Sequence, residues 1–329
     1  MAIFRLAKAD DIEAIARLTA TAGSGLTTVP RTRSEVTECV EKTLRCLAGD
    51  PTSHRLLFVA EHAGEIAGIS SIIPRLGVDR PFYSFKRSRH TRHASRPKLT
   101  VTYETLQLTT DFDGYTELAT LYVAPQARGS GFARLLSLGR LAYIANHRTA
   151  FDDRLMADIR GWFDADGESP FWTHLTSKFI DVPYDQADKL CMNDGHFIDQ
   201  LLPSLPIFLN LLPETVSRCV GRPNDNSAGA VKLLEGTGFR RTDLCDVFDG
   251  GPSMVCETDR TLIARTVTAV QGVTAAALQS ALVFGGQGAD FRATIGLADW
   301  GSQRVSRDVV DELATEILTM ARIDAEVMP

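Results

Sequence analysis

Two glycines in the stretch YVAPQARGSGFARLL (residues 122–136) mark a place where the sequence predicts chemistry. Gly129 and Gly131 come directly after a strand-like run and directly before a helix-like run, which is the context in which a backbone loop binds phosphate. The N-terminus of a helix presents unpaired N–H groups and the positive end of the helix dipole. The spacing Gln126-x-x-Gly129-x-Gly131 is too short for a G-x-x-x-x-G-K-S/T loop. The stretch therefore predicts either a different phosphate loop or an ordinary strand-to-helix turn.

The elements that must position this loop alternate between strands and helices. We expect a strand and a helix over residues 3–23, with Asp10 or Asp11 as the helix cap, and then two strands around Gly64. A single strand over 115–125 leads into the loop, and a helix over 131–147 and a strand over 154–164 follow it. This order indicates an α/β or α+β fold with a mixed sheet flanked by helices.

The amino-acid composition of the second half of the chain changes twice. Residues 169–222 are aromatic and interrupted by prolines, which predicts an insertion of short packed helices. A helix that ends at Gly238 and a strand that runs into a Gly-Gly-Pro turn follow it. From Thr261 the composition is dominated by Ala, Val, Thr and Gly. One helix is expected there, over 306–323. We therefore expect two unequal domains, 1–260 and a small C-terminal domain over 261–329.

The composition is that of a folded soluble protein, and the lack of targeting signals leads us to expect it in the cytoplasm. Apolar residues make up 44% of the 329 residues and charged residues 23%, as in globular domains. No apolar run reaches the roughly 20 residues that a membrane-spanning helix needs. The N-terminus lacks the basic segment followed by an apolar run that is typical of a signal peptide. The six cysteines form no C-x-x-C pair, so we expect reduced thiols, and Cys191 lacks neighbours that would activate it as a nucleophile. We expect no metal, because no His/Asp/Glu cluster has ligand spacing.

One basic segment stands out against the net charge of −6. The stretch FKRSRHTRHASRPK (residues 85–98) concentrates Lys and Arg with two histidines, and three readings are open: a solvated loop, an anion site for a ligand, or an RNA contact. The RNA contact is the weakest of these, because the overall charge opposes nucleic-acid binding. We therefore expect no nucleic-acid partner and no membrane.

The glycine loop resembles the pyrophosphate loop of the GCN5-related N-acetyltransferase superfamily, whose members bind acyl-coenzyme A there. Six further motifs occur in the order seen in bacterial arginine N-succinyltransferases, and the resemblance covers roughly residues 1–260. That family transfers succinyl from succinyl-CoA to the α-amino group of arginine in arginine catabolism, and its C-terminal region is β-rich. The motifs are SGLTTVP (24–30), PFYSF (81–85), HAS (93–95), ELATLYV (117–123), GESPFW (167–172) and DVFDGGP (246–252).

The resemblance implies a site for succinyl-CoA or another acyl-CoA along the loop and the strand before it. It places a succinyl-CoA contact at Leu121, where a backbone N–H can hold the thioester oxygen; an ordinary core leucine is the alternative. Removing one such oxyanion donor commonly costs about 3 kcal/mol of transition-state stabilisation. The residues expected to bind the cosubstrate are Leu121, Val123, Gln126, Arg128, Gly129, Ser130 and Gly131.

The proton donor of that family is a histidine, and the matching position here is Asn224. An amide cannot exchange a proton near neutral pH, so either another group transfers the proton or Asn224 only orients a substrate or caps the following helix. His93 and His174 are the candidate replacements, because they lie in or beside the HAS and GESPFW motifs. The acceptor amine is expected to meet carboxylates, and the succinyl carboxylate or a CoA phosphate to meet an arginine. The candidates for these contacts are Glu117, Asp158, Glu168 and Arg92.

Two further hypotheses compete with arginine succinylation. The chain could acylate another amine or use another acyl donor, since its departures from the family cluster near the acceptor. It could also be a noncatalytic subunit paired with a related active chain, because the histidine is missing. We expect either a homodimer or a heterodimer with a related subunit.

Overall fold

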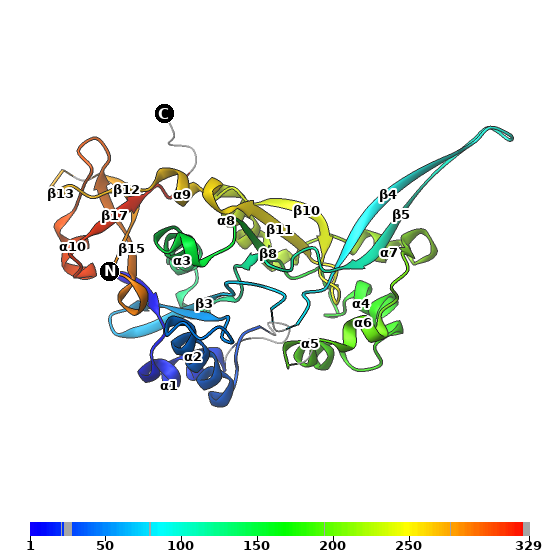
Figure 1. Ribbon diagram of the computed structural model, residues 1–329, viewed down its shortest axis with the longest axis horizontal. Coiled ribbons are helices and arrows are strands. Elements are labelled where there is room, and N and C mark those ends of the chain that lie inside the picture. The colour runs from blue at the N-terminus through cyan, green and yellow to red at the C-terminus, as the bar shows by residue number, and fades with distance from the viewer. Residues whose placement is uncertain (21, 23–27, 79, 194, 277, 325–329) are drawn as a thin grey trace.

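The computed structural model describes residues 1–324 except 21, 23–27, 79, 194 and 277. Of the SGLTTVP motif, residues 24–27 lie outside the described part. Two sheets form the frame, one at each end of the molecule, and helices cover them (Figure 1). This arrangement confirms the expected mixed α/β class. No helix within the described residues is long and apolar enough to cross a membrane.

The first sheet combines strands from the two ends of the chain. Its order is β12-β17-β14-β15-β1-β2-β3-β7, with β13 and β16 attached beside β15. Because β1 pairs with both β2 and β15, the C-terminal strands continue the sheet of the N-terminal half; the domain boundary at Thr261 stays a prediction. The strands are β1 (Ala2–Leu6), β2 (Leu56–His62), β3 (Glu65–Ile72), β7 (Leu121–Val123), β12 (Thr268–Ala269), β13 (Gly272–Val273), β14 (Gln279–Gly285), β15 (Arg292–Asp299), β16 (Arg304–Val305) and β17 (Leu318–Ala321).

The second sheet has the order β6-β8-β11-β10-β4-β5-β9. The basic segment forms one of its strands, so the loop reading was wrong: pairing of residues 84–94 with 99–109 makes both segments strands of a long hairpin. The strands are β4 (Ser84–Ala94), β5 (Leu99–Thr109), β6 (Thr116–Glu117), β8 (Arg154–Asp158), β9 (Ile207–Phe208), β10 (Arg240–Cys245) and β11 (Pro252–Glu257).

Helices cover both faces of the first sheet near β7. The helices α1 and α2 bury Ile15 and Val36 against β2 and β3, whereas α3 packs on the opposite face. The insertion after β8 consists of short helices, as expected, and it surrounds a separate aromatic core. The helices are α1 (Ile12–Thr19), α2 (Arg33–Leu47), α3 (Phe132–Asn146), α4 (Pro170–His174), α5 (Tyr184–Asn193), α6 (Phe197–Leu201), α7 (Glu214–Cys219), α8 (Ala228–Gly236), α9 (Leu262–Thr266) and α10 (Arg307–Leu313).

Two local predictions hold only in part. Asp11 occupies the N-cap position of α1, as expected, but its side chain makes no cap hydrogen bond to that helix; the carboxylate instead accepts from the Arg5 guanidinium at 2.7 Å and from the Lys8 N–H at 2.7 Å. The long C-terminal helix stops at Leu313, where Ala314 has a positive φ of 49°. The chain beyond it pairs as β17 with β14, so sheet pairing overrides the helical pattern there.

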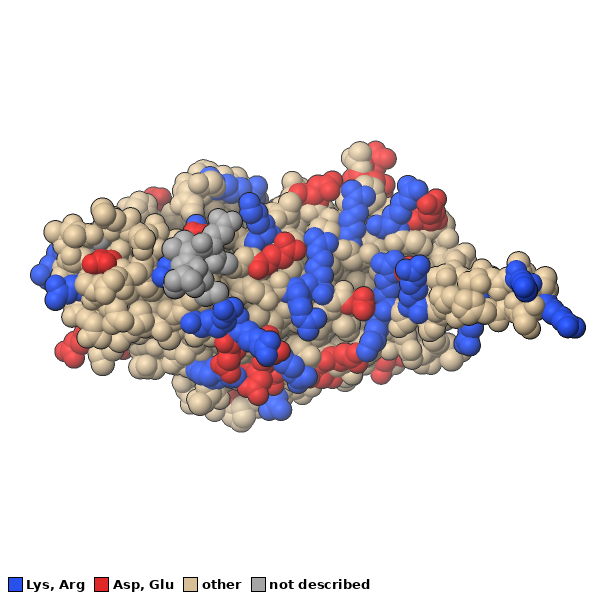
Figure 2. All heavy atoms as spheres, turned by 90° about the horizontal axis from the view of Figure 1, so that it is seen from above, with Lys and Arg blue, Asp and Glu red and all other residues tan. Residues whose placement is uncertain are grey.

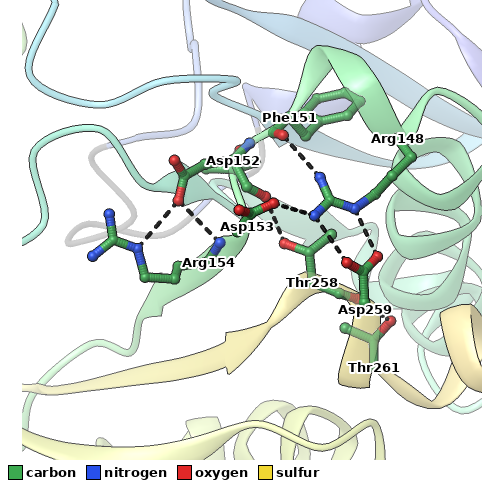
Figure 3. A network of polar contacts seen from close by, with 9 residues as sticks. Arg148, Phe151, Asp152, Asp153, Arg154, Thr258, Asp259 and Thr261 are labelled. Atoms are coloured by element: carbon green, nitrogen blue, oxygen red, sulfur yellow. Dashed lines mark hydrogen bonds and ion pairs between the residues drawn. The ribbon is translucent and has the colours of Figure 1, made fainter.

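A polar network fixes the turn between α3 and β8 (Figure 3). The Arg148 guanidinium donates to the Phe151 carbonyl at 3.0 Å and forms ion pairs with Asp153 and Asp259. The hydroxyl of Thr258 donates to the backbone oxygen of Asp152 at 2.6 Å. These contacts join the end of α3 to β8 and to the residues after β11. The ladders with β11 and β6 place β8 in the second sheet, while the strand before α3 belongs to the first.

Candidate active site

The chain changes sheets between β6 and β7. The Leu118 N–H donates to the Met156 carbonyl in β8 at 2.8 Å, which is a contact with the second sheet. The Ser71 N–H of β3 then contacts two carbonyls, that of Ala119 at 3.1 Å and that of Thr120 at 3.0 Å, a bulge in the first sheet. The single strand expected over 115–125 is therefore broken, and β7 and β8 lie on either side of a split.

Backbone strain and a buried arginine mark this bulge. Thr120 has a φ of 36°, a conformation that β-branched residues rarely adopt. Arg140 reaches from α3 and donates to the Ala119 carbonyl at 2.9 Å. Burial lowers the pKa of Arg140 to about 10, while Glu117 opposes that change, so the side chain stays charged near neutral pH. The buried guanidinium holds the Ala119 carbonyl of the bulge in place. It thereby fixes the direction in which the following amides of β7 point.

The backbone of β7 presents amides to the split. The Ala124 N–H donates to the Ala67 carbonyl on the β3 side at 2.9 Å. Successive residues of an antiparallel strand point their backbone groups to opposite sides, so those of Leu121 and Val123 face away from β3. The Val123 carbonyl accepts from the Arg128 Nε at 3.4 Å. The Leu121 N–H therefore lies where a donor to a thioester oxygen is expected.

The glycine loop begins one residue after β7. A 3-10 turn (Pro125–Ala127) leads to Gly129 and Gly131, whose φ values of 83° and 85° favour glycine. The Gly131 carbonyl accepts the Leu135 N–H at 3.0 Å, so Gly131 is the N-cap of α3. A Cβ at either glycine would meet nothing within 4 Å, and the two residues are exposed. The loop thus has open space at a helix N-terminus, with the exposed side chains of Gln126, Arg128 and Ser130 beside it.

Two predicted acidic residues lie on one face of the second sheet. Glu117 pairs with Met156, and Asp158 follows two residues later in β8, so all three side chains share a face. Leu155 and Ala157 point the other way, into the core that contains α3. Both residues keep partial exposure. The site therefore has acidic groups on the side of the split opposite α3.

The pKa of Asp158 is raised to about 7, chiefly by burial and also by the charges of Glu117 and Asp249. The Ser253 hydroxyl donates to Asp158 Oδ1 at 2.5 Å across the β8–β11 pair and opposes that rise. Burial also raises the pKa of Glu117, although Arg140 and two other arginines lower it. A carboxyl with a pKa near neutrality can accept and return a proton during a reaction.

The DVFDGGP motif forms the loop that supports the end of β8. Asp249 accepts the N–H groups of Gly161 and Gly251, both at 2.8 Å, and burial raises its pKa. A Cβ on Gly251 would approach the Ile159 carbonyl to 2.1 Å, so only glycine allows this backbone contact. The motif therefore positions the residues that directly follow Asp158.

Asn224 lies beside the same end of β8. Its N–H donates to the Arg160 carbonyl at 2.8 Å, and its side chain accepts from the Asn226 N–H at 3.0 Å. The side chain thus caps the turn before α8, in line with the capping alternative. Two buried donors nearby, Arg160 Nε and Trp162 Nε1, have no hydrogen-bond partner among the described residues. Unpaired buried donors are costly, and they suit an anionic ligand group such as a carboxylate.

The other predicted site residues lie away from this cluster. His93 and Arg92 are exposed on β4, in the outer half of the long hairpin, where His93 Nδ1 lies 2.9 Å from the Thr100 hydroxyl. His174 is exposed at the end of α4, and Glu168 is exposed in the loop before it. The structure therefore brings together Leu121, Glu117 and Asp158 from the predicted set, and their roles stay predictions.

Three residues of the site were not singled out from the sequence. Asp249 lies inside a motif that was noticed, and Ser253 follows it directly, but nothing in the spacing pairs Ser253 with Asp158. Arg140 gave one signal, a charged residue within an otherwise apolar helical run. Within the described residues, no group of three or more His, Cys, Asp or Glu could hold a metal ion.

Comparisons with known proteins agree over most of the chain. The family model for the arginine N-succinyltransferase beta subunit matches residues 2–263. An arginine N-succinyltransferase of Citrobacter koseri is 31% identical over 99% of this chain and 94% of its own length. One from Escherichia coli is 32% identical over 79% of this chain and 77% of its own. The solved arginine/ornithine succinyltransferase subunit AI from Pseudomonas aeruginosa matches with a TM-score of 0.86 and 28% identity over 99% of both chains.

Proposed function

The chain belongs to the arginine N-succinyltransferase family, and from that premise we propose that it transfers succinyl from succinyl-CoA to the α-amino group of arginine. The pyrophosphate of the cosubstrate binds the glycine loop at the N-terminus of α3, and its thioester enters the split between β7 and β8. The observation that carries the proposal is the pair of carboxylates on one face beside that split, of which Asp158 has a pKa of about 7.

The reaction requires an uncharged amine, so the ammonium group of the acceptor first loses a proton to solvent. The amine nitrogen then attacks the thioester carbonyl, and the Leu121 N–H stabilises the oxygen that becomes negative. Asp158 accepts the second proton of the nitrogen, the C–S bond breaks, and the departing thiolate receives that proton. The products are the amide and free coenzyme A, and Asp158 ends in its starting state.

Asp158 takes this role because Asn224, at the position of the family's histidine, cannot transfer a proton. The Ser253 hydroxyl occupies Oδ1 of Asp158, which leaves Oδ2 for the acceptor amine. Glu117, on the same face, provides a carboxylate for the guanidinium of arginine. Arg160 Nε and Trp162 Nε1 provide the unpaired donors for a carboxylate of the acyl group or of the acceptor.

The setting of the enzyme is also part of the proposal. All six cysteines are free thiols in the structure, which suits the reducing cytoplasm. We expect the protein to act there as an oligomer of this chain. The solved Pseudomonas aeruginosa relative is named for arginine and ornithine, so ornithine is the second acceptor to test.

The test is release of free thiol by the purified protein with a panel of acyl-CoAs and amines. Succinyl-CoA with arginine should give the highest kcat/KM, and mass spectrometry should detect a product of the mass of N-succinylarginine. Glu117→Gln should raise the KM for arginine, whereas the matched control Glu41→Gln, exposed in α2, should leave it unchanged. Higher turnover with another pair would correct the substrates. Binding of acyl-CoA without turnover of any amine would support the noncatalytic alternative.

A further inference from the structure

The β4–β5 hairpin extends far from the body of the protein (Figure 1). Near the body, β10 pairs with Phe85 and Lys86 of β4, and β9 pairs with Thr105 and Leu106 of β5. Farther out, between residues 90 and 103, the two strands pair only with each other among the described residues. We call residues 90–103 the arm. A two-stranded hairpin alone is marginally stable in water, so its length points to a surface that supports it.

One face of the arm, which we call its apolar face, presents an uncovered row of apolar side chains from β5, and His90, Arg92 and Ala94 of β4 lie beside that row. Leu99 and Val101 are each 56% exposed on this face, and Tyr103 continues the same row along β5. At its base Tyr103 contacts Phe208, with ring centroids 5.4 Å apart, and Phe208 is itself 43% exposed.

The opposite face of the arm is polar. Thr100 and Thr102 alternate with the apolar residues along β5, and they pair with His93 and Thr91 of β4. This period of two is typical of a strand with one buried face. The sequence therefore has the pattern of a covered strand at a place where the single chain offers no cover among its described residues.

We propose that the apolar face of the arm packs against the body of a second copy of this chain. The distribution of charge supports a second copy of the chain as the partner. The hairpin 84–109 contains six Lys and Arg residues and a single acidic residue, Glu104, and so carries +5. Because the whole chain carries −6, the remainder carries −11. Figure 2 shows the hairpin leaving the body with Lys or Arg side chains at its far end.

A nucleic acid fits this surface less well than a second copy. At the base of the hairpin the cations are already paired, Lys86 with Asp111 at 2.9 Å and Arg87 with Glu104 at 2.6 Å. Leu99 and Val101 offer apolar area rather than contacts to phosphate. A two-fold arrangement satisfies both copies at once, since each arm meets the body of the other. The inference assigns an interface to the oligomer of the proposed function, and it does not rest on the proposed reaction.

The test is sedimentation equilibrium of the full-length protein and of two matched double variants. Leu99→Thr/Val101→Thr removes the apolar row and places a residue of high strand propensity at both positions, whereas Thr100→Ser/Thr102→Ser changes the polar face. The wild type should be a dimer of the 36.0 kDa chain. The first variant should raise the dissociation constant at least about 100-fold, because both arms of the dimer lose apolar contact. The control variant should dimerise like the wild type.

A monomeric wild type at tens of micromolar would overturn the proposal, as would equal dimerisation of all three proteins. Nucleic acid that stays bound at physiological salt, with a monomeric protein after nuclease treatment, would also overturn it in favour of an RNA contact. Hydrogen exchange needs no variant. Amides of residues 99–103 should exchange more slowly as the wild-type concentration rises through the dissociation constant, and exchange independent of concentration would contradict the arm interface.

Discussion

Replacing Ser253 with alanine should change the pH dependence of the reaction without removing its catalytic carboxylate. The Ser253 hydroxyl donates to Asp158 Oδ1 at 2.5 Å and so favours the ionised carboxylate. Burial and the neighbouring charges of Glu117 and Asp249 act in the opposite direction, and the pKa of Asp158 lies at about 7. In Ser253→Ala only the groups that raise the pKa remain.

The size of the effect follows from the kind of hydrogen bond that is lost. A hydrogen bond to a charged group contributes about 1.5 to 3 kcal/mol, and about 1.4 kcal/mol corresponds to one pKa unit. The acid limb of kcat/KM, expected at about pH 7 in the wild type, should therefore move upward by about 1 to 2 pH units. At pH 7, where half of the wild-type carboxyl is ionised, the variant should be about 5- to 50-fold slower, and it should recover at high pH.

The assay is thiol release with succinyl-CoA and arginine between pH 5.5 and 9.5. Thr242→Val is the matched control, because the Thr242 hydroxyl donates to the Ser253 carbonyl at 3.0 Å and makes no bond to Asp158. The control should keep the acid limb of the wild type. An acid limb that stays in place in Ser253→Ala, or a loss of rate that is equal at every pH, would refute the assignment of that limb to Asp158.

Three further predictions test other parts of the account. Gly131→Ala should cost about 1 to 2 kcal/mol through its left-handed backbone and raise the KM for acyl-CoA, whereas Gly229→Ala, in α8 with open space around it, should leave that KM unchanged; equal KM values would contradict the phosphate loop. Asn224→Ala should lower the free energy of unfolding by about 1 kcal/mol and change kcat less than 10-fold, while a loss of 100-fold or more would show Asn224 to be catalytic. Burial lowers the pKa of His147, so the unfolded state binds more protons than the folded state below pH 6.5, and stability should fall as the pH falls through that range. The melting temperature of His147→Gln should fall less than that of the wild type over the same range, and identical pH profiles of the two proteins would contradict this.

The sequence predicted the strands and helices that carry their own periodicity. The two strands around Gly64, the helix after the glycine loop and the short helices after Ser169 were all expected, because burial on one face leaves a repeating apolar pattern. The basic segment was read as a loop because its charges hide the alternation that its partner strand shows. Its strand state depends on pairing with residues 99–109, which a local reading of charge does not detect.

The candidate site was predictable only in part for a related reason. The glycine loop and the family motifs are local, so they identified Leu121, Glu117 and Asp158 as candidates. The bulge at Thr120 and the bond between Ser253 and Asp158 depend on how two sheets meet, and residues far apart in sequence supply them. No spacing in the sequence encodes the burial that raises the pKa of Asp158, because that burial arises only when the strands of the second sheet and the loops around them have assembled.

The most direct test of the account is the turnover of Asp158→Asn beside its affinity for succinyl-CoA. The substitution keeps the shape of the side chain, and the Ser253 hydroxyl can still donate to the amide oxygen, so the fold should be preserved. Calorimetry should give a dissociation constant for succinyl-CoA within about 3-fold of the wild type, while kcat should fall by about 10²- to 10⁴-fold. Unchanged binding with a kcat close to that of the wild type would contradict proton transfer by Asp158.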